Sequence, residues 1–305
     1  MKKLFLISST AGATEYHFNK KQIEEIYKKH GRKDEIIVKE TRYRGHLEEI
    51  VNEFLASFYK DKLIICLGGD GTINEVVNLC LGHDVAIGLI PTGTGNDFAK
   101  NFDYENFKIE DTFDTSIRPI DLIKVNGKYC VNVTSLGFDT EVLKTAYDYL
   151  DKDKSLGKRA YLKAVGDRVK NLTYQDLSIK LSLADSGEIY LEDEFLVSAI
   201  CNGGYYGSGF NPAPDAKIDD GILNYVVAYK FPKWQLLPLI LKYKRGKHQS
   251  SSYLDEFKAL SGEIRSDKEF LANIDGEIFR SKLIRFEVRP GTLSWAYFKK
   301  QSPWA

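Results

Sequence analysis

Three glycines within a four-residue span form the most distinctive chemical feature of the sequence. They follow the apolar run Leu63–Leu67 and precede a helical pattern that begins at Ile73. Glycine lets a backbone turn tightly and approach a ligand closely, and the first N–H groups of a helix attract anions, so this loop suits a phosphate group. The loop consists of Gly68, Gly69, Asp70, Gly71 and Thr72.

Asp70 changes the chemistry of this loop, because a carboxylate repels a bare phosphate but accepts one that carries Mg²⁺. The alternative interpretation is an ordinary glycine-rich turn in which Thr72 caps the helix. A bare glycine pattern would favour the turn. The strand-to-helix context and the embedded aspartate favour the phosphate site.

A second loop with the same properties follows the next apolar run, at Pro91–Ala99. Gly93 and Gly95 allow close approach of the backbone, Thr94 offers a hydroxyl, and Asp97 adds a second carboxylate. Asn96 could at the same time cap a short helix that begins at Asp97. If the two loops leave neighbouring strands, Asp70 and Asp97 face one site, and two acids beside phosphate-binding glycines indicate a metal ion.

The elements that must position these loops alternate between short apolar runs and helical patterns over the first hundred residues. Such an order predicts an α/β, Rossmann-like domain with a mainly parallel sheet, whose ligands collect beyond the carboxyl ends of the strands. The expected strands are Leu4–Ile7, Glu35–Val38, Leu63–Leu67 and Ala86–Ile90, and the expected helices are Lys20–His30, Leu47–Tyr59 and Ile73–Leu81.

The pattern changes near Ile120, from which point strand candidates follow one another. Asn126-Gly127 predicts a hairpin between Ile120–Val125 and Lys128–Val133. One helical stretch is expected at Gly157–Asn171. The second half is therefore predicted to be a mostly antiparallel β-sandwich or flattened barrel. Its further expected strands are Ser178–Leu183, Phe195–Cys201, Leu223–Tyr229, Phe270–Ile274, Leu283–Val288 and Leu293–Phe298.

Composition excludes several classes of protein. The 305 residues carry 43 basic and 43 acidic side chains, so no overall charge favours nucleic-acid binding. Four widely spaced cysteines in apolar stretches fit a reducing cytoplasm, and the five histidines show no spacing typical of zinc ligands. Trp234–Leu241 is the most apolar late stretch, and it is too short to span a bilayer. No transmembrane segment is expected.

The two glycine loops, in this order, resemble the catalytic domain of the diacylglycerol kinase and sphingosine kinase superfamily, and the similarity to soluble bacterial diacylglycerol or lipid kinases extends over nearly the whole chain. The first loop alone is less specific, because NAD kinases and phosphofructokinases share it. The resemblance implies an ATP-binding domain at residues 1–122 with 289–305, a β-rich lipid-binding domain at 123–288, and ATP with Mg²⁺ as cofactors.

The resemblance also implies ATP contacts along the carboxyl ends of the first strands. They fall on Gly12, Thr41, the loop from Gly68 to Glu75 with Asn74, and Thr94. The loop after the first strand departs from the family's pattern, because Ser8–Gly12 lacks the expected Asn and Pro. From the sequence alone, Thr41 would be an ordinary loop residue.

Two magnesium sites follow from the same resemblance. Asp121 is expected to join Asp70 and Asp97 around a catalytic Mg²⁺, although by itself it reads as a solvent-facing aspartate at the start of a strand. The Asp220 carboxylate and the main-chain carbonyls of Lys217 and Ile222 are expected to bind a structural Mg²⁺. Without the resemblance, this segment reads as a turn.

The segment Ile274-Asp275-Gly276-Glu277 matches the family's catalytic signature. A kinase that acts on a hydroxyl needs a group to accept its proton. We assign Glu277 as the proton acceptor and Asp275 as the competitor, since two residues that alternate along an extended segment face the same way. A hairpin turn with two solvated acids is the alternative.

Two further segments have two interpretations each. Gly203–Phe210 forms either a wall of the acceptor pocket or an irregular strand connection. Trp234–Leu241, followed by four cations, is either a core helix with a cationic end or a segment that rests on an anionic membrane.

The expected function is transfer of the γ-phosphoryl of ATP to the hydroxyl of diacylglycerol or a related lipid at a membrane surface, giving phosphatidic acid. The expected location is cytoplasmic, peripheral to the membrane, and a homodimer is left open. The alternatives are phosphorylation of a sphingoid base or NAD, and a non-catalytic nucleotide- or lipid-binding protein.

Overall fold

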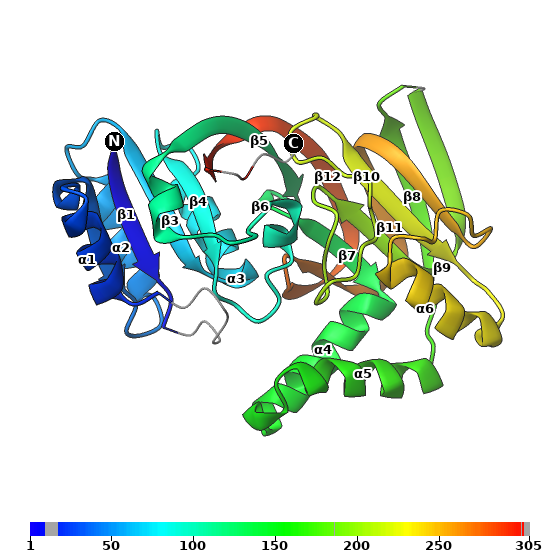
Figure 1. The fold of residues 1–305 in the computed structure, drawn as a ribbon. Helices are drawn as coiled ribbons and strands as arrows, with labels where there is room; N and C mark the ends of the chain where they lie inside the picture. The colour runs from blue at the N-terminus through cyan, green and yellow to red at the C-terminus, as the bar shows by residue number, and fades with distance from the viewer. Residues whose placement is uncertain (10–17, 186, 300, 302–305) are drawn as a thin grey trace. The chain divides into compact units, whose positions relative to one another are not determined.

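A computed structural model describes residues 1–9, 18–185, 187–299 and 301 (Figure 1). The chain divides into two compact units, 1–120 with 291–305 and 121–290. These limits differ by two residues from the predicted domain limits at 122 and 289. Two strands, β5 (Thr115–Val125) and β12 (Glu277–Phe298), pass from one unit to the other.

The first unit is the predicted α/β domain. Its parallel strands lie in the order β4-β3-β1-β2, and Trp295 of β12 pairs in parallel with Ile87 of β4. Short 3₁₀ helices cover 33–35, 98–101 and 109–113. The regular elements are β1 (Lys2–Ile7), α1 (Lys20–Lys29), β2 (Ile36–Glu40), α2 (His46–Leu55), β3 (Lys62–Gly68), α3 (Asp70–Cys80) and β4 (Ala86–Pro91).

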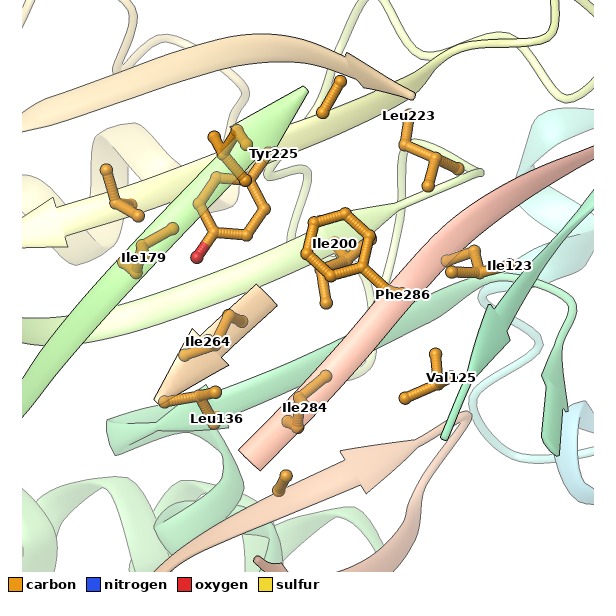
Figure 2. Close-up of a cluster of buried hydrophobic side chains, with 14 of the residues drawn as sticks. Ile123, Val125, Leu136, Ile179, Ile200, Leu223, Tyr225, Ile264, Ile284 and Phe286 are labelled. Atoms are coloured by element: carbon orange, nitrogen blue, oxygen red, sulfur yellow. The ribbon is translucent and has the colours of Figure 1, made fainter. Parts of the chain in front are cut away.

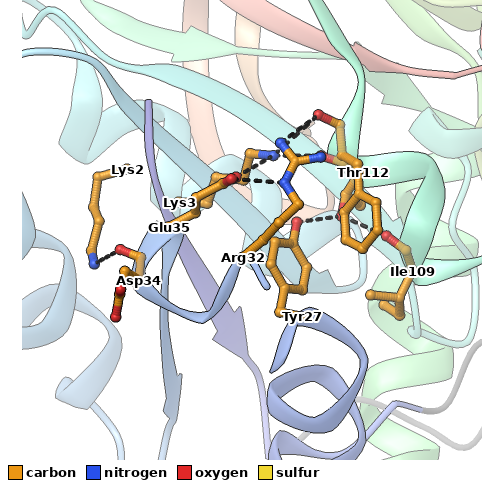
Figure 3. A network of polar contacts seen from close by, with 9 residues as sticks. Lys2, Lys3, Tyr27, Arg32, Asp34, Glu35, Ile109 and Thr112 are labelled. Atoms are coloured by element: carbon orange, nitrogen blue, oxygen red, sulfur yellow. Dashed lines mark hydrogen bonds and ion pairs between the residues drawn. The ribbon is translucent and has the colours of Figure 1, made fainter. Parts of the chain in front are cut away.

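The sheet of this unit is buried on both faces, as expected for parallel strands. Phe5 and Ile65 pack with Ile23 and Tyr27 of α1 on one face, and the alternate residues of β1 and β3 are equally buried. The start of β1 is fixed by Lys3, whose Nζ lies 2.7 Å from the carbonyl oxygen of Thr112 (Figure 3). Burial lowers the pKa of Lys3 to about 8, and the charge of Arg32 contributes.

The second unit is mostly antiparallel. Asn126 and Gly127 both have positive φ, as the predicted hairpin requires. Its elements, besides parts of β5 and β12, are β6 (Lys128–Cys130), β7 (Val133–Gly137), α4 (Phe138–Lys152), α5 (Lys158–Lys170), β8 (Gln175–Leu183), β9 (Gly187–Cys201), β10 (Leu223–Tyr229), α6 (Leu236–Lys244) and β11 (Leu254–Ile274), with 3₁₀ helices at 154–156 and 233–235.

The core of this unit gathers side chains from β5 and from every strand between β7 and β12 (Figure 2). Tyr225 stacks on Phe286 with ring centroids 5.7 Å apart, and its hydroxyl lies 2.6 Å from the hydroxyl of Ser198. The tyrosine therefore fills the core without leaving a buried hydroxyl unpaired.

Three predictions for the second half of the chain were wrong. The strand expected at Phe270–Ile274 is only the end of β11, and the two strands expected at Leu283–Val288 and Leu293–Phe298 are one strand, β12. Pro290 interrupts the sequence pattern but not the strand, since it lies beyond Glu287, the last residue that pairs with β11.

The third error is α4, which the sequence analysis missed. The helix was detectable, because Phe138, Val142, Ala146 and Tyr149 follow helical spacing. Phe138, Val142 and Ala146 are buried. The omission matters because α4 carries two residues that belong to the candidate site.

Candidate functional site

Four loops leave the sheet of the first unit at one edge. Glu40, Ile7, Leu67 and Ile90 stand in one row across the paired strands, so the loops after β2, β1, β3 and β4 begin side by side. This is the carboxyl edge of parallel strands, where ligands of such sheets bind. It carries both glycine loops.

The two glycine loops touch through their backbones. A Cβ placed on Gly93 would lie 2.4 Å from the Cα of Gly69, and the backbone N–H of Thr92 donates to the carbonyl of Gly68 at 2.9 Å. No side chain fits between the loops at Gly93, so glycine is required there by the close approach.

The helix after the first loop begins earlier than predicted. Gly69 occupies the N-cap position, Asp70 is the first helical residue, and among the described residues no side-chain capping bond is formed at this N-cap. Thr72 therefore does not occupy the capping position that the alternative interpretation gave it. Thr72 instead lies against Gly68, where an added Cβ would meet the Thr72 Cβ at 2.6 Å. The first backbone N–H groups of a helix that starts in this way can bind an anion.

Asp70 ties the two loops together. Its carboxylate accepts hydrogen bonds from the backbone N–H groups of Asp97 and Phe98, at 3.1 and 3.0 Å. An added Cβ on Gly95 would lie 3.0 Å from Oδ2 of Asp70 and 3.7 Å from Oδ2 of Asp97. The two carboxylates therefore border the same small space, as the strand order predicted.

Asp97 and Asn96 belong to the second glycine loop, and we call the place where the two loops meet the polar corner. Asp97 is buried and forms an ion pair with Lys100. Asn96 has a φ of 51° and donates from Nδ2 to the carbonyl of Gly93, so it does not cap the short helix that follows. Its Oδ1 is buried and has no hydrogen-bond partner among the described residues. This amide oxygen lies against Gly69 and Gly93, where the two loops meet, and it could accept a hydrogen bond from a water bound to a magnesium ion.

The residues predicted to contact ATP differ in how deeply they are buried. Thr41 is buried, and its hydroxyl oxygen accepts the backbone N–H of Ser9 at 2.9 Å, so it holds the loop after β1. Asn74 is buried within α3, whereas Glu75 and Thr94 are exposed. Gly12 lies outside the described residues.

In the second unit, Asp275 occupies a hairpin turn between β11 and β12. Asp275 and Gly276 have φ of 47° and 94°, and Ile274 pairs with Glu277 across the turn. Positive φ at both central positions is typical of a tight hairpin. The two acids therefore do not alternate along an extended strand, and the prediction that they share a face for this reason was wrong.

The Asp275 carboxylate is fully engaged with the backbone. It accepts the N–H groups of Val131, Asn132 and Val133 at 2.6, 3.0 and 3.1 Å, and the Cys130 thiol lies at 3.2 Å. Such charge-assisted bonds fix the hairpin against the segment between β6 and β7. The alternative of two solvated acids thus fails for Asp275.

Glu277 has the opposite surroundings. It is the first residue of β12, and its exposed side chain forms no hydrogen bond or ion pair with the described residues. The neighbouring turn is held by Tyr147 of α4, whose hydroxyl donates to the carbonyl of Gly276 at 3.1 Å. The sequence analysis missed Tyr147 together with its helix.

Asp121 is buried in the middle of β5, not solvent-facing at the start of a strand. Its Oδ2 accepts the N–H of Gly221 at 2.7 Å, and its own N–H donates to the carbonyl of Ile218 at 2.6 Å. These bonds connect it to the segment that contains Asp220. Partial desolvation, with a contribution from the Asp121 charge, raises the pKa of Asp220.

No group of three or more His, Cys, Asp or Glu side chains in the described ranges is arranged to hold a metal ion. A magnesium site here would therefore use one or two carboxylates with carbonyl oxygens and water, the usual ligands of this ion. The donor sets around Asp70 and around Asp220 both fit that description.

An apolar cavity of about 70 Å³ lies in the second unit. Residues of α4, α5 and α6 line it, together with Tyr206 and Phe210. Gly203–Phe210 is an irregular connection between β9 and β10, and its Tyr206 and Phe210 line this cavity; a role as a wall of the acceptor pocket stays a prediction.

One carboxylate faces this apolar cavity. Asp139 of α4 lines it, and its Oδ1 accepts the N–H of Thr140 at 2.8 Å. Its Oδ2 is buried without a hydrogen-bond partner in the described structure. Burial raises the pKa of Asp139 to about 6, although neighbouring Ser135 and Tyr206 oppose the rise. The sequence analysis missed this residue because it missed α4.

Comparison with known proteins places these features in a family. Residues 2–125 match the family described as the diacylglycerol kinase catalytic domain, and residues 132–296 match the YegS C-terminal NAD kinase beta sandwich-like domain. The "Probable lipid kinase YegS-like" of Pseudomonas aeruginosa is 31% identical over 265 residues, which cover 85% of this chain and 83% of that protein. The chain belongs to this family of lipid kinases.

Other relatives agree with the predicted resemblance. The protein named diacylglycerol kinase of Bacillus subtilis is 34% identical over 224 residues, 70% of this chain and 71% of that protein. A structure titled as a diacylglycerol kinase from Bacillus anthracis has a TM-score of 0.69 at 20% identity and covers 97% of this chain and 96% of that one, which shows the shared fold. The predicted membership and two-part fold are confirmed.

Proposed function

We propose that this lipid kinase transfers the γ-phosphoryl group of Mg-ATP to the hydroxyl of diacylglycerol or a related lipid, giving phosphatidic acid in the first case. The observation that carries the proposal is the contact between the two glycine loops, with the carboxylates of Asp70 and Asp97 around Gly95. Phosphoryl transfer depends on positioning and charge stabilisation, which such a rigid polar corner provides.

Each residue of this corner has a separate task in the proposal. The backbone N–H groups at the start of α3 bind phosphate oxygens, and Gly68, Gly69 and Gly93 let the phosphates approach the backbone. Bound Mg²⁺ neutralises phosphate charge. Asp70, Asp97 and the free Oδ1 of Asn96 supply its oxygen ligands or hold its waters.

Glu277 is the proposed acceptor of the proton from the lipid hydroxyl. Its exposed carboxylate is not committed to any described hydrogen bond, whereas Asp275 already accepts three backbone N–H groups. Asp275 is therefore a positioning residue, because it holds the turn that Glu277 directly follows. A base needs an oxygen that is available to accept the proton, and the carboxylate of Glu277 offers one.

The apolar cavity supports a lipid acceptor over a soluble one such as NAD. Its lining is almost entirely aliphatic and aromatic, which suits an acyl chain. At about 70 Å³ it has room for only a few methylene groups, so a longer chain requires the side chains of α5 and α6 to separate. Asp139 would then face a hydroxyl or ammonium group of the lipid.

A further magnesium site is proposed at Asp220 with the carbonyls of Lys217 and Ile222. The raised pKa of Asp220, caused mainly by partial desolvation with a smaller contribution from the charge of Asp121, supports it, because a bound cation would favour the ionised carboxylate.

A panel of acceptors tests the function. The purified protein, labelled ATP and Mg²⁺ are incubated with diacylglycerol, monoacylglycerol, ceramide, sphingosine or NAD. Labelled phosphatidic acid is the expected product. Asp70→Asn should abolish the transfer, whereas Asp84→Asn, an exposed acid of the same unit, should not. Transfer to NAD alone, or no transfer to any acceptor, would overturn the proposal.

A further inference from the structure

The short helix α6 has two different faces. Leu236 and Leu239 are buried and line the apolar cavity. On the other side, Trp234, Leu237 and Leu241 are 73%, 67% and 47% exposed. These three positions are spaced by three and four residues, so they lie along one side of the helical segment.

The exposed apolar side chains are accompanied by an uncompensated positive charge. From 232 to 247 the chain contains five basic residues and no acidic one, although the whole chain is neutral. All five side chains are exposed, and none forms an ion pair among the described residues. Lys230, just before the segment, is paired with Glu194. The five are Lys233, Lys242, Lys244, Arg245 and Lys247.

The cations lie beside the apolar side chains and not opposite them. At 100° per residue, Arg245 is close in direction to Leu241, and Lys242 and Lys244 lie on its two sides. The opposite direction is occupied by the buried Leu236 and Leu239. A tryptophan and leucines bordered by cations form the pattern of a helix that lies in a membrane interface.

We propose that this surface, which we call the α6 surface, docks on an anionic lipid bilayer. It comprises Trp234, Leu237 and Leu241 with the five surrounding cations. The apolar side chains enter the interface while the lysines and Arg245 bind lipid phosphates. This contact is peripheral, because no helix in the described part of the chain is long and apolar enough to cross a membrane.

Charge decides between a bilayer and a second copy of this chain. In a symmetric dimer the same patch faces itself, so five unpaired cations would meet five others without an acid between them. An anionic bilayer instead offers a negative surface to all of them. The inference rests on the α6 residues alone and does not require the proposed phosphoryl transfer.

Vesicle binding without nucleotide tests the proposal. The full chain is sedimented with vesicles of phosphatidylcholine alone or with added phosphatidylglycerol, and only the anionic vesicles should carry it down. Leu237→Ser with Leu241→Ser, and separately Lys242→Glu with Arg245→Glu, should each weaken this binding at least tenfold. The control pair, Phe58→Ser with Lys60→Glu, removes an exposed aromatic and a cation from the first unit and should leave binding unchanged.

Tryptophan fluorescence locates the contact. Of the three tryptophans, Trp234 is exposed, Trp295 is buried and Trp304 lies outside the described residues. Anionic vesicles should therefore shift the emission to shorter wavelength in the parent and in Trp304→Phe, and not in Trp234→Phe. Equal binding of parent and α6 variants would overturn the proposal. The proposal would also be overturned if the α6 substitutions lowered the molar mass of the protein, measured by light scattering, without weakening vesicle binding. That result would identify the surface as a dimer contact.

A second measurement separates this proposal from the function. The α6 variants should phosphorylate lipid presented in detergent micelles as the parent does, and lose activity only on anionic vesicles. A protein that binds vesicles but phosphorylates no lipid would refute the proposed function and leave the docking surface intact. If the α6 variants phosphorylate lipid as well as the parent does in both micelles and anionic vesicles, the proposed docking surface is refuted and the proposed function is not.

Discussion

Replacing Asp139 by asparagine should stabilise the protein near neutral pH and lose most of this advantage in acid. The carboxyl group borders an apolar cavity, and its buried Oδ2 has no hydrogen-bond partner in the described structure. Burial raises its pKa from 3.8 to about 6, so the folded protein favours the neutral acid. Asparagine keeps the shape and one acceptor oxygen but never carries the charge.

The sign and size of the effect of Asp139 on stability follow from the pKa values of its carboxyl group in the unfolded and folded states. Well below pH 3.8 the acid is neutral in both the folded and the unfolded state and does not change the stability. As the pH rises, the unfolded chain releases its proton first, so stability is lost until the folded group has also ionised, above about pH 6. The full penalty is at most about 3 kcal/mol at pH 8 and falls to about 1 kcal/mol at pH 4.5, and water in the cavity reduces both values.

Urea unfolding at several pH values between these limits measures the effect. Only the difference between Asp139→Asn and the parent matters, since the other titrating groups are common to both. The difference should rise with pH through the interval between 3.8 and about 6. A difference that does not change with pH, or a variant that is less stable than the parent near pH 8, would refute the reasoning.

Four further substitutions test the remaining assignments. Glu277→Gln should lower turnover about 10²–10⁴-fold without changing ATP affinity or the free energy of unfolding. A Glu277→Gln enzyme with parental turnover would contradict the base assignment. Asp275→Asn should lower the free energy of unfolding by about 1–3 kcal/mol, because it removes an acceptor of backbone N–H groups. For Asp220→Ala, calorimetry should show that Mg²⁺ no longer raises the Tm as it does in the parent, and an equal rise in both would exclude the site. Gly93→Ala should separate the two loops, because its Cβ would lie 2.4 Å from the Cα of Gly69, and should weaken ATP binding in a titration, while Gly166→Ala, whose Cβ meets no atom within 4 Å, should not.

The sequence by itself determined the features that depend on neighbours along the chain. Apolar runs alternating with helical patterns specified β1 to β4, and Gly68 to Thr72 marked the turn into α3, since both signals are local. Parallel strands then bring the ends of β3 and β4 to one edge, so the meeting of Asp70 and Asp97 could be predicted.

Only the tertiary structure decided which of the remaining acidic side chains are held by backbone N–H groups, because these partners lie far away in the sequence. Asp275 is held by N–H groups at positions 131 to 133, and Asp121 by the N–H of Gly221. A carboxylate that accepts backbone N–H groups and one that is free look the same in a sequence, so Asp275 could not be distinguished there from Glu277. The same reason applies to α6: its spacing indicated an apolar helix, but which leucines pack against the cavity and which remain exposed depends on strands and helices that only folding brings together.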